Sequence, residues 1–408
     1  MTTTIELEGV CDQRFEAVRD AFAANFAAGK EIGASVAITL KGETVVDLWG
    51  GDADEARTRP WTEDTIVNVY STTKGLGATC AHILVDRGEL DLDAPIASYW
   101  PEFAQAGKES LPVRYALSHR AGLPAIAKTL ERETLFDWDA MCAALAEQEP
   151  WWEPGSGHGY HAVTYAWLVG EVVRRIDGRS IGTFFREEVA EPLRLDAHIG
   201  FGPELDVRVA DTVQAPPPPS GQEDLLADVL ADKGSMSYLA FANPPALGPK
   251  IVNTRAWRAA EICSANGHTN ARSLARLYGA LGAATRGESF DGVQLVSAAT
   301  MEQARTVQSA GIDKVLKLDN RIALGFMLPS PMRSFSANPL AFGHAGAGGS
   351  LGFCDPENGL SFGYTMNQMQ AGGVGGDSRW WGLIQGMYNA VDVEFEAPSS
   401  AGRGTSVG

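Results

Sequence analysis

The spacing of apolar residues predicts the secondary structure near the N-terminus. Apolar side chains recur every three to four positions over residues 13–29 and again over residues 71–87, which predicts two amphipathic helices. Between them, the β-rich runs Gly33–Leu40 and Glu43–Trp49 flank a short Lys-Gly turn. Two such runs joined by a short turn predict a β-hairpin.

Strand patterns return near the C-terminus, after a middle section (residues 89–280) that is predicted to be mainly helical with loops. Strands at both ends with helices between them imply one sheet built from both termini, with a helical region inserted. The predicted fold class is therefore α+β. The C-terminal elements predicted are strands at Leu340–His344, Leu351–Cys354 and Leu360–Met366 and a helix at Arg379–Ala390.

We predict a division into two structural units. Residues 1–75 and 285–408 would form a discontinuous α/β domain, and residues 76–284 a mainly helical domain. The tail from Ala397 is rich in Ser, Gly and Thr and is predicted to be disordered. The stiff stretch Pro216–Pro219 is interpreted as a surface connection, in preference to the wall of a substrate cleft.

Composition and charge narrow the class of protein. The chain has 408 residues, 45% hydrophobic and 21% charged, as is ordinary for a soluble globular protein. Its net charge of −18 argues against nucleic acids and anionic membranes as partners. No apolar run approaches the roughly 20 residues of a membrane span, and the N-terminus lacks the pattern of a secretory signal. Five scattered cysteines predict reduced thiols and a cytoplasmic location.

The first candidate for chemistry is Ser71-Thr72-Thr73-Lys74, which opens the second predicted helix. Residues three apart lie on one face of a helix, so the Lys74 amine would stand near the Ser71 hydroxyl. A serine hydroxyl becomes a good nucleophile when a neighbouring base takes its proton, and a lysine can be that base if burial lowers its pKa. Because about one such tetrad is expected by chance in a chain of this length, its meaning depends on other motifs.

Two motifs downstream supply further polar groups. The Pro/Gly-rich loop Trp152–Ala162 delivers Tyr160 just ahead of an apolar helical run, and a tyrosine placed in this way can shuttle a proton. The second motif is the glycine-rich run Phe342–Ser350. Glycine in a strand marks the close approach of a ligand or another backbone, and such an edge can present N–H groups to a developing oxyanion.

In this order, the three motifs resemble those of the serine β-lactamase and penicillin-binding-protein superfamily, above all its esterase branch, the family VIII carboxylesterases. Gly88–Pro95, Leu117–Pro124 and Tyr165–Glu171 add to the likeness, which covers about residues 10–395. The resemblance implies an antiparallel sheet flanked by the two terminal helices, a helical domain, and an active site between them.

The resemblance also implies roles for single residues. Ser71 would be the acylated nucleophile, Lys74 its base and Tyr160 the second proton-transfer group. The backbone N–H groups of Ser71 and Ala347 would form the oxyanion hole, and the helix dipole would favour negative charge beside Ser71. The implied substrate-binding residues are His344, Gly346, Trp152 and His161.

Two departures from the lactamase pattern favour esters over lactams. Lactamases carry Tyr-x-Asn where this chain has Tyr160–Ala162, so the amide that would hold a β-lactam side chain is missing. They carry Lys-Thr-Gly where this chain has His344–Gly346, so a permanent cation that would bind a substrate carboxylate becomes a titratable imidazole. The groups that carry out acyl transfer remain.

Two other patterns receive a plain interpretation. Gly348–Gly352 matches the lipase motif G-x-S-x-G, but that motif needs a strand–turn–helix and a later histidine. Ser350 instead precedes a predicted strand, and no histidine follows His344, so Ser350 is not expected to be the nucleophile. The H-x-x-H spacing of His158 and His161 lacks a third ligand, and no metal or organic cofactor is expected.

We therefore interpret the sequence as that of a serine carboxylesterase acting on small-molecule esters, with short acyl chains as the default expectation. Either Lys74 or Tyr160 could deprotonate the serine, since two coupled groups share their titration. The alternatives are an amide-bond hydrolase of the same superfamily (a β-lactamase, a D-aminopeptidase or an amide-oligomer hydrolase), an acyltransferase, or a non-catalytic scaffold. The sequence makes no prediction of the oligomeric state.

Overall fold

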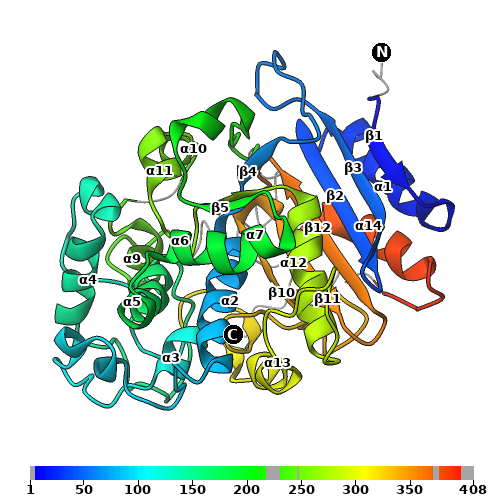
Figure 1. Cartoon of the computed structure of the whole chain (residues 1–408). Helices are drawn as coiled ribbons and strands as arrows, with labels where there is room; N and C mark the ends of the chain where they lie inside the picture. The colour runs from blue at the N-terminus through cyan, green and yellow to red at the C-terminus, as the bar shows by residue number, and fades with distance from the viewer. Residues whose placement is uncertain (1–4, 217–229, 246–247, 371–375, 397–408) are drawn as a thin grey trace.

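A six-stranded antiparallel sheet lies beside a mainly helical region in the computed structural model (Figure 1). The structure describes residues 5–216, 230–245, 248–370 and 376–396. N-terminal and C-terminal strands stand side by side in the order β1-β3-β2-β12-β11-β10, which confirms a sheet built from both ends of the chain. The strands are β1 Glu8–Cys11, β2 Gly33–Leu40, β3 Glu43–Gly51, β10 Phe342–Ala345, β11 Leu351–Asp355 and β12 Leu360–Met366.

Helices cover both faces of this sheet (Figure 1). The terminal helices α1 (Glu16–Ala27) and α14 (Ser378–Asn389) pack against each other on one face. Helix α12 (Ala271–Ala284) covers the other face, across β2, β12 and β11. The predicted α+β fold, with terminal helices flanking an antiparallel sheet, is therefore confirmed.

A row of small residues lets α12 approach the sheet closely. Gly352, Gly363 and Ala37 are cross-strand neighbours on β11, β12 and β2. Above this row α12 presents Ala271 and Ala275, which form a small core cluster with Ala37. A Cβ atom on Gly363 would collide with the Ala271 carbonyl and stand 2.9 Å from the Ala275 nitrogen. The distance between sheet and helix is thus set by the absence of side chains.

Helix α2 (Thr73–Asp86) lies between the sheet and the helical region. It contacts strand β10 on one side and helices α5 (Tyr165–Asp177) and α6 (Ile181–Phe185) on the other. Its residues are buried from Thr73 to Leu84, so the start of this helix is fixed from all sides.

The remaining elements are shorter. A four-stranded sheet has the order β5-β7-β4-β6, and three of its strands, all but β4, come from the section that was predicted to be mainly helical. Its strands are β4 Ile66–Asn68, β5 Ala197–Ile199, β6 Val209–Ala210 and β7 Gly267–Thr269, and a separate hairpin is formed by β8 Ser309–Ile312 and β9 Asp319–Ile322. The other α-helices among the described residues are α3 Val113–Leu117, α4 Trp138–Glu147, α7 Glu191–Leu193, α9 Met236–Ala242, α10 Pro249–Val252, α11 Arg255–Ala259 and α13 Ala298–Arg305.

The observed boundaries differ from the predicted ones by a few residues. The helix predicted over 13–29 begins as a 3₁₀ turn and becomes α-helical at Glu16. The strand predicted at Leu340–His344 is shifted to Phe342–Ala345, and the edge strand β1 was not predicted. Strand β1 is mostly exposed and shows no apolar alternation, so pairing with β3 defines it rather than its own sequence.

Other predictions stand outside what the structure describes. The tail from residue 397 and the residues 217–219 of the polyproline stretch lie beyond the described ranges. The division into two domains stays a prediction, although α12, which it assigned to the helical unit, packs against the sheet. Within the described ranges, no helix combines the length and apolar character that crossing a membrane requires.

The contact between α12 and the sheet is testable through Gly363. We expect Gly363→Ala to lower the free energy of unfolding by about 1–3 kcal/mol, because the added methyl group forces the helix away from β12. Gly234→Ala is the control, since Gly234 is exposed and its Cβ would meet only Asp232, at 3.5 Å. Thermal unfolding of both variants measures the difference. Equal melting temperatures would show that α12 is not seated on Gly363.

Candidate active site

Ser71 lies in a strained turn between β4 and α2. Residues Tyr70–Thr72 form a 3₁₀ turn, and the buried Tyr70 adopts a positive φ of 44°. Such a backbone costs of order 1–3 kcal/mol in a non-glycine residue and persists only where surrounding packing imposes it. Ser71 is partly exposed, whereas the residues that follow it along α2 are buried. The turn therefore presents one hydroxyl at the head of an otherwise buried helix.

Lys74 stands one turn further along, as the sequence spacing predicted. Its Nζ lies 3.3 Å from Ser71 Oγ and donates to the carbonyls of Ala162 and Ser264, at 2.8 and 2.9 Å. Burial holds the pKa of the Lys74 amine well below its usual value. A neutral amine has two N–H groups and one lone pair. Once the amine has lost its proton, the two carbonyls take up its N–H groups, which leaves its lone pair for the Ser71 hydroxyl.

Tyr160 lies beside the Ser71–Lys74 pair. The Lys74 Nζ lies 4.7 Å from the centre of the Tyr160 ring. Burial raises the pKa of Tyr160, and the Ser71 hydroxyl and the Arg333 guanidinium oppose that rise only in part. Among the described residues, no hydrogen bond of good geometry reaches the buried Tyr160 hydroxyl. The phenol is thus close to Ser71, protonated at neutral pH, and available to donate.

Two residues that the sequence interpretation did not include support Tyr160. The buried carboxylate of Asp313 accepts a hydrogen bond from the Tyr160 backbone N–H at 3.0 Å, and it also accepts from Val315 N and Leu316 N. Arg333 is buried nearby and donates to Asn320 Oδ1 at 3.1 Å. Both residues lie more than 150 positions after Tyr160 in the chain, so no local pattern pointed to them.

The histidines around Tyr160 are buried and neutral. His119 Nδ1 accepts a hydrogen bond from His161 N at 3.0 Å, and its ring lies 4.8 Å from the Tyr160 ring, centre to centre. Burial lowers the pKa of His161 to about 3. Burial likewise holds the pKa of His344 well below its usual value, and the nearby Lys74 and Arg333 add to this effect. The titratable imidazole expected at position 344 therefore carries no charge at neutral pH.

The predicted substrate-binding residues differ in what they offer. His161 is buried, and both ring nitrogens engage the backbone, Nε2 with Leu123 N at 3.1 Å and Nδ1 with Gly159 O at 2.7 Å. This hydrogen bonding fixes the loop that carries Tyr160. Trp152 is partly exposed, and its ring meets that of His161 edge-on. The described ranges contain no group of three or more His, Cys, Asp or Glu side chains able to hold a metal ion.

Strand β10 runs directly past the Ser71 turn. A Cβ atom on Gly346, just after this strand, would collide with Val69 O and Ser350 Oγ and stand 3.0 Å from Thr72 Oγ1. Only glycine allows this approach, which brings Ala347 and its N–H group next to the turn. The 3₁₀ turn Ala347–Gly349 then leads into β11.

Ser350 has a structural contact here. Its buried hydroxyl donates to Val69 O at 2.7 Å and lies 3.0 Å from Thr72 Oγ1. The next residue begins strand β11, so the G-x-S-x-G run forms no strand–turn–helix elbow. Ser350 therefore binds the start of β11 to the Ser71 turn.

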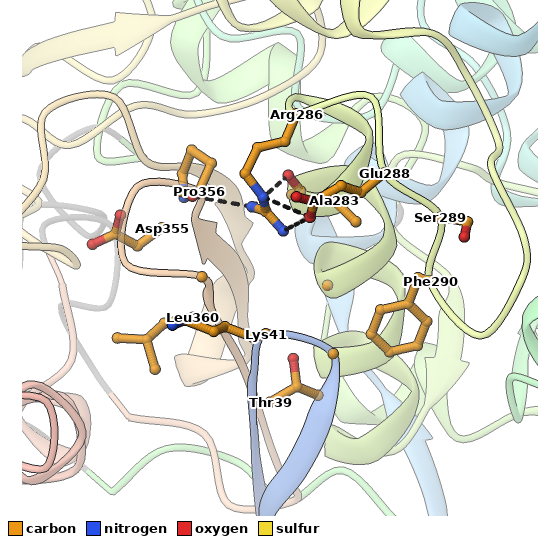
Figure 2. Close-up of a pocket in the computed structure, with 14 residues that line it drawn as sticks. Thr39, Lys41, Ala283, Arg286, Glu288, Ser289, Phe290, Asp355, Pro356 and Leu360 are labelled. Atoms are coloured by element: carbon orange, nitrogen blue, oxygen red, sulfur yellow. Dashed lines mark hydrogen bonds and ion pairs between the residues drawn. The ribbon is translucent and has the colours of Figure 1, made fainter.

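A small cleft elsewhere in the molecule offers no comparable chemistry. Figure 2 shows it where the turn between β2 and β3 meets the end of α12. Arg286 crosses this cleft and donates to the carbonyls of Gly282 and Pro356, both at 3.0 Å. The cleft has a volume of about 40 Å³, which holds only a few water molecules.

Comparison with known proteins agrees with the fold and the motifs. The protein named Esterase/beta-lactamase LipL from Mycobacterium tuberculosis is 35% identical over 372 residues, which are 88% of this chain and 83% of that protein. A crystal structure described as a family VIII carboxylesterase is 43% identical, with a TM-score of 0.86 over 95% of this chain and 100% of that one. A penicillin-binding-protein homologue from Caulobacter crescentus is 41% identical, with a TM-score of 0.85 over 94% of this chain and 100% of that one.

The resemblance inferred from the motifs is thereby confirmed. A family model described as Beta-lactamase matches residues 18–384, which is most of the chain. The chain therefore belongs to the Beta-lactamase family.

Proposed function

We propose that this protein is a serine carboxylesterase that hydrolyses small-molecule esters through an acyl-enzyme on Ser71. The observation that carries the proposal is the 3.3 Å approach of the desolvated Lys74 amine to Ser71 Oγ. Relatives named as an esterase and as a carboxylesterase support the same reaction class. Short acyl chains remain the default expectation, and the five free cysteines fit a cytoplasmic location.

Acylation uses Lys74 as the base. Its lone pair takes the proton of Ser71 while Oγ forms a bond to the ester carbonyl carbon. The resulting oxyanion is bound by the N–H groups of Ser71 and Ala347, and each donor of this kind lowers the barrier by about 3–4 kcal/mol. As the bond to the leaving alcohol breaks, the alkoxide takes a proton from Tyr160, which recovers it from Lys74.

Deacylation repeats these transfers with water as the nucleophile. Water gives its proton to Lys74 and attacks the acyl carbon, and the Ser71 oxygen leaves with a proton from Tyr160, which Lys74 then replaces. This assignment of base and acid follows from the opposite effects of burial on the two groups: the pKa of Lys74 falls and that of Tyr160 rises.

An amide-bond hydrolase of the same family is the second candidate. The 41% identity to a penicillin-binding-protein homologue favours it over a scaffold. Both reactions need the same nucleophile and base, and they differ in the leaving group and in the groups that recognise the substrate. A comparison of p-nitrophenyl esters with a chromogenic cephalosporin and a D-amino-acid anilide separates the two activities.

The identity of the nucleophile is tested by a pair of serine substitutions. We expect Ser71→Ala to lower kcat/KM for p-nitrophenyl acetate by about 10³-fold or more and to abolish labelling by a fluorophosphonate. Ser350→Ala should still form the acyl-enzyme, with a stability loss of about 1 kcal/mol for the lost hydrogen bonds. Esterase activity that survives in Ser71→Ala and disappears in Ser350→Ala would reverse the assignment.

The protonation states predict the pH dependence of Ser71 reactivity. Below the pKa of Lys74 the amine is protonated and accepts nothing, so the rate of fluorophosphonate labelling should rise with pH through that pKa. Because the Lys74 pKa is well below 10.5, the midpoint should also lie well below 10.5. The rate should then stay level at alkaline pH, since the raised pKa of Tyr160 keeps its proton in place. Lys74→Met, which has no titrating amine, is the control. A midpoint near the ordinary lysine value would contradict a desolvated base.

The role of position 344 is tested by restoring a cation. We expect His344→Lys to lower KM at least about fivefold for an ester that carries a carboxylate near the scissile bond, because an ammonium group attracts it. His344→Gln, which stays neutral, is the matched variant and should give no such change. If His344→Lys changes KM equally for the charged ester and its uncharged analogue, position 344 does not face the substrate.

A further inference from the structure

Side chains from the first turn of helix α14 donate hydrogen bonds to the turn Ala347–Gly349. Arg379 Nη2 donates to the carbonyl of Gly348, and the Trp380 indole Nε1 donates to the carbonyl of Gly349 at 2.6 Å. Both residues are 1% exposed. Two consecutive carbonyls on one side of the turn are thus bound by two consecutive residues of a helix that lies far away in sequence.

Arg379 is fixed by its own partners. Its guanidinium pairs with Asp377 Oδ2 at 2.6 Å and Glu31 Oε2 at 3.1 Å, and it donates to Gln368 O at 2.8 Å. Asp377 also caps α14 by accepting from Arg379 N at 2.9 Å. Since both carboxylates are buried, the planar guanidinium has one position in which all its hydrogen bonds are made.

The backbone of the turn Ala347–Gly349 leaves just enough room for the ion pair of Arg379 and Asp377. Gly348 and Gly349 adopt φ angles of 82° and 126°, which side-chain-bearing residues rarely adopt. A Cβ atom on Gly349 would also collide with the Arg379 guanidinium and the Asp377 carboxylate. Gly349 is therefore required for two reasons: its φ angle favours glycine, and a side chain there would displace the buried Arg379 guanidinium.

The hydrogen bonds continue from Arg379 to Ala347 through two peptide planes. The carbonyl of Gly348 and the N–H of Gly349 belong to one planar trans peptide and point in opposite directions. Gly349 N donates to Gly346 O at 3.2 Å. The carbonyl of Gly346 shares its peptide plane with the N–H of Ala347, which points the opposite way. Each plane is fixed at its carbonyl end, so the direction of the Ala347 N–H follows from the position of the guanidinium.

We propose that Arg379 and Trp380 are positioning residues for esterase catalysis: Arg379 aims the Ala347 N–H at the oxyanion through the peptides 348–349 and 346–347, and Trp380 fixes Gly349, whose N–H links these two peptides, by binding its carbonyl. A cation at the far end also polarises each peptide in the sense that makes the Ala347 N–H a stronger donor, since hydrogen-bond chains in a low-dielectric interior reinforce one another. The inference rests on the proposed function, because it assumes that Ala347 N–H binds the oxyanion.

The test compares kcat with KM for a p-nitrophenyl ester in two variants. Trp380→Phe keeps an aromatic ring and removes one donor, and we expect kcat to fall about 3–10-fold with KM unchanged. Arg379→Lys keeps the charge but replaces the planar fork, and we expect kcat to fall about 10–100-fold, again with KM unchanged. If Arg379→Lys fails to fold, Trp380→Phe still decides the question.

Trp138→Phe is the matched control, since its indole donates to Glu171 Oε2 at 2.7 Å within the helical region. It should lose stability without losing kcat, when all variants are assayed well below their melting temperatures. Unchanged kcat in folded Trp380→Phe and Arg379→Lys, or an equal fall in Trp138→Phe, would overturn the positioning role. The native activity and its loss in Ser71→Ala are measured in parallel. Esterase activity that depends on Ser71 but not on Arg379 would therefore refute only this inference.

Discussion

The buried amine of Lys74 is the constraint on which the site depends. Its partners are two neutral carbonyls, of Ala162 and Ser264, and the hydroxyl of Ser71. A cation in these surroundings would be costly, and loss of the proton removes that cost while it creates a base. The two carbonyls come from the helical region, before α5 and β7, whereas α2 also contacts strand β10 of the sheet. The helical region and the sheet must therefore be docked around α2 before Lys74 becomes able to accept a proton.

The absence of a side chain positions the backbone at several glycines, and three of them bear on the sheet and the site. Gly363 lets α12 settle on the sheet, Gly346 lets β10 pass the Ser71 turn, and Gly349 lets the next turn meet the Arg379 guanidinium. A Cβ atom would collide with a carbonyl oxygen at Gly363 and Gly346, and at Gly349 with a guanidinium and a carboxylate that are held by buried ion pairs. Because such neighbours yield little, these contacts set distances more sharply than apolar packing does. This precision is valuable where N–H groups have to face a developing charge.

The sequence predicted the parts of the site that local spacing determines. Residues three apart are neighbours in a 3₁₀ turn as in an α-helix, so the pairing of Ser71 with Lys74 holds although Ser71 precedes the α-helix. The strands and the terminal helices followed from the residue patterns, and the resemblance to the family implied that these helices flank the sheet. Asp313 and Arg379 had no local signal, because each acts on a backbone group that is distant along the chain. The charge state of His344 also escaped prediction, since burial by the whole fold decides it.

The electrostatics of the site argue for an uncharged substrate. Burial penalises the charged forms of Lys74 and His344 and holds the pKa of each well below its usual value. A substrate carboxylate at position 344 would lose its hydration and meet a neutral imidazole in place of the cation that the lactamase pattern carries there. The guanidinium of Arg333 lies near His344, but it is buried and donates to Asn320 Oδ1. The proton donor points the same way. Burial raises the pKa of Tyr160, which makes it a weak acid, yet a departing alkoxide is basic enough to take its proton. The site offers a base and oriented N–H groups, but no cation at position 344 to bind a substrate charge. An ester with no charge near the scissile bond therefore fits it best.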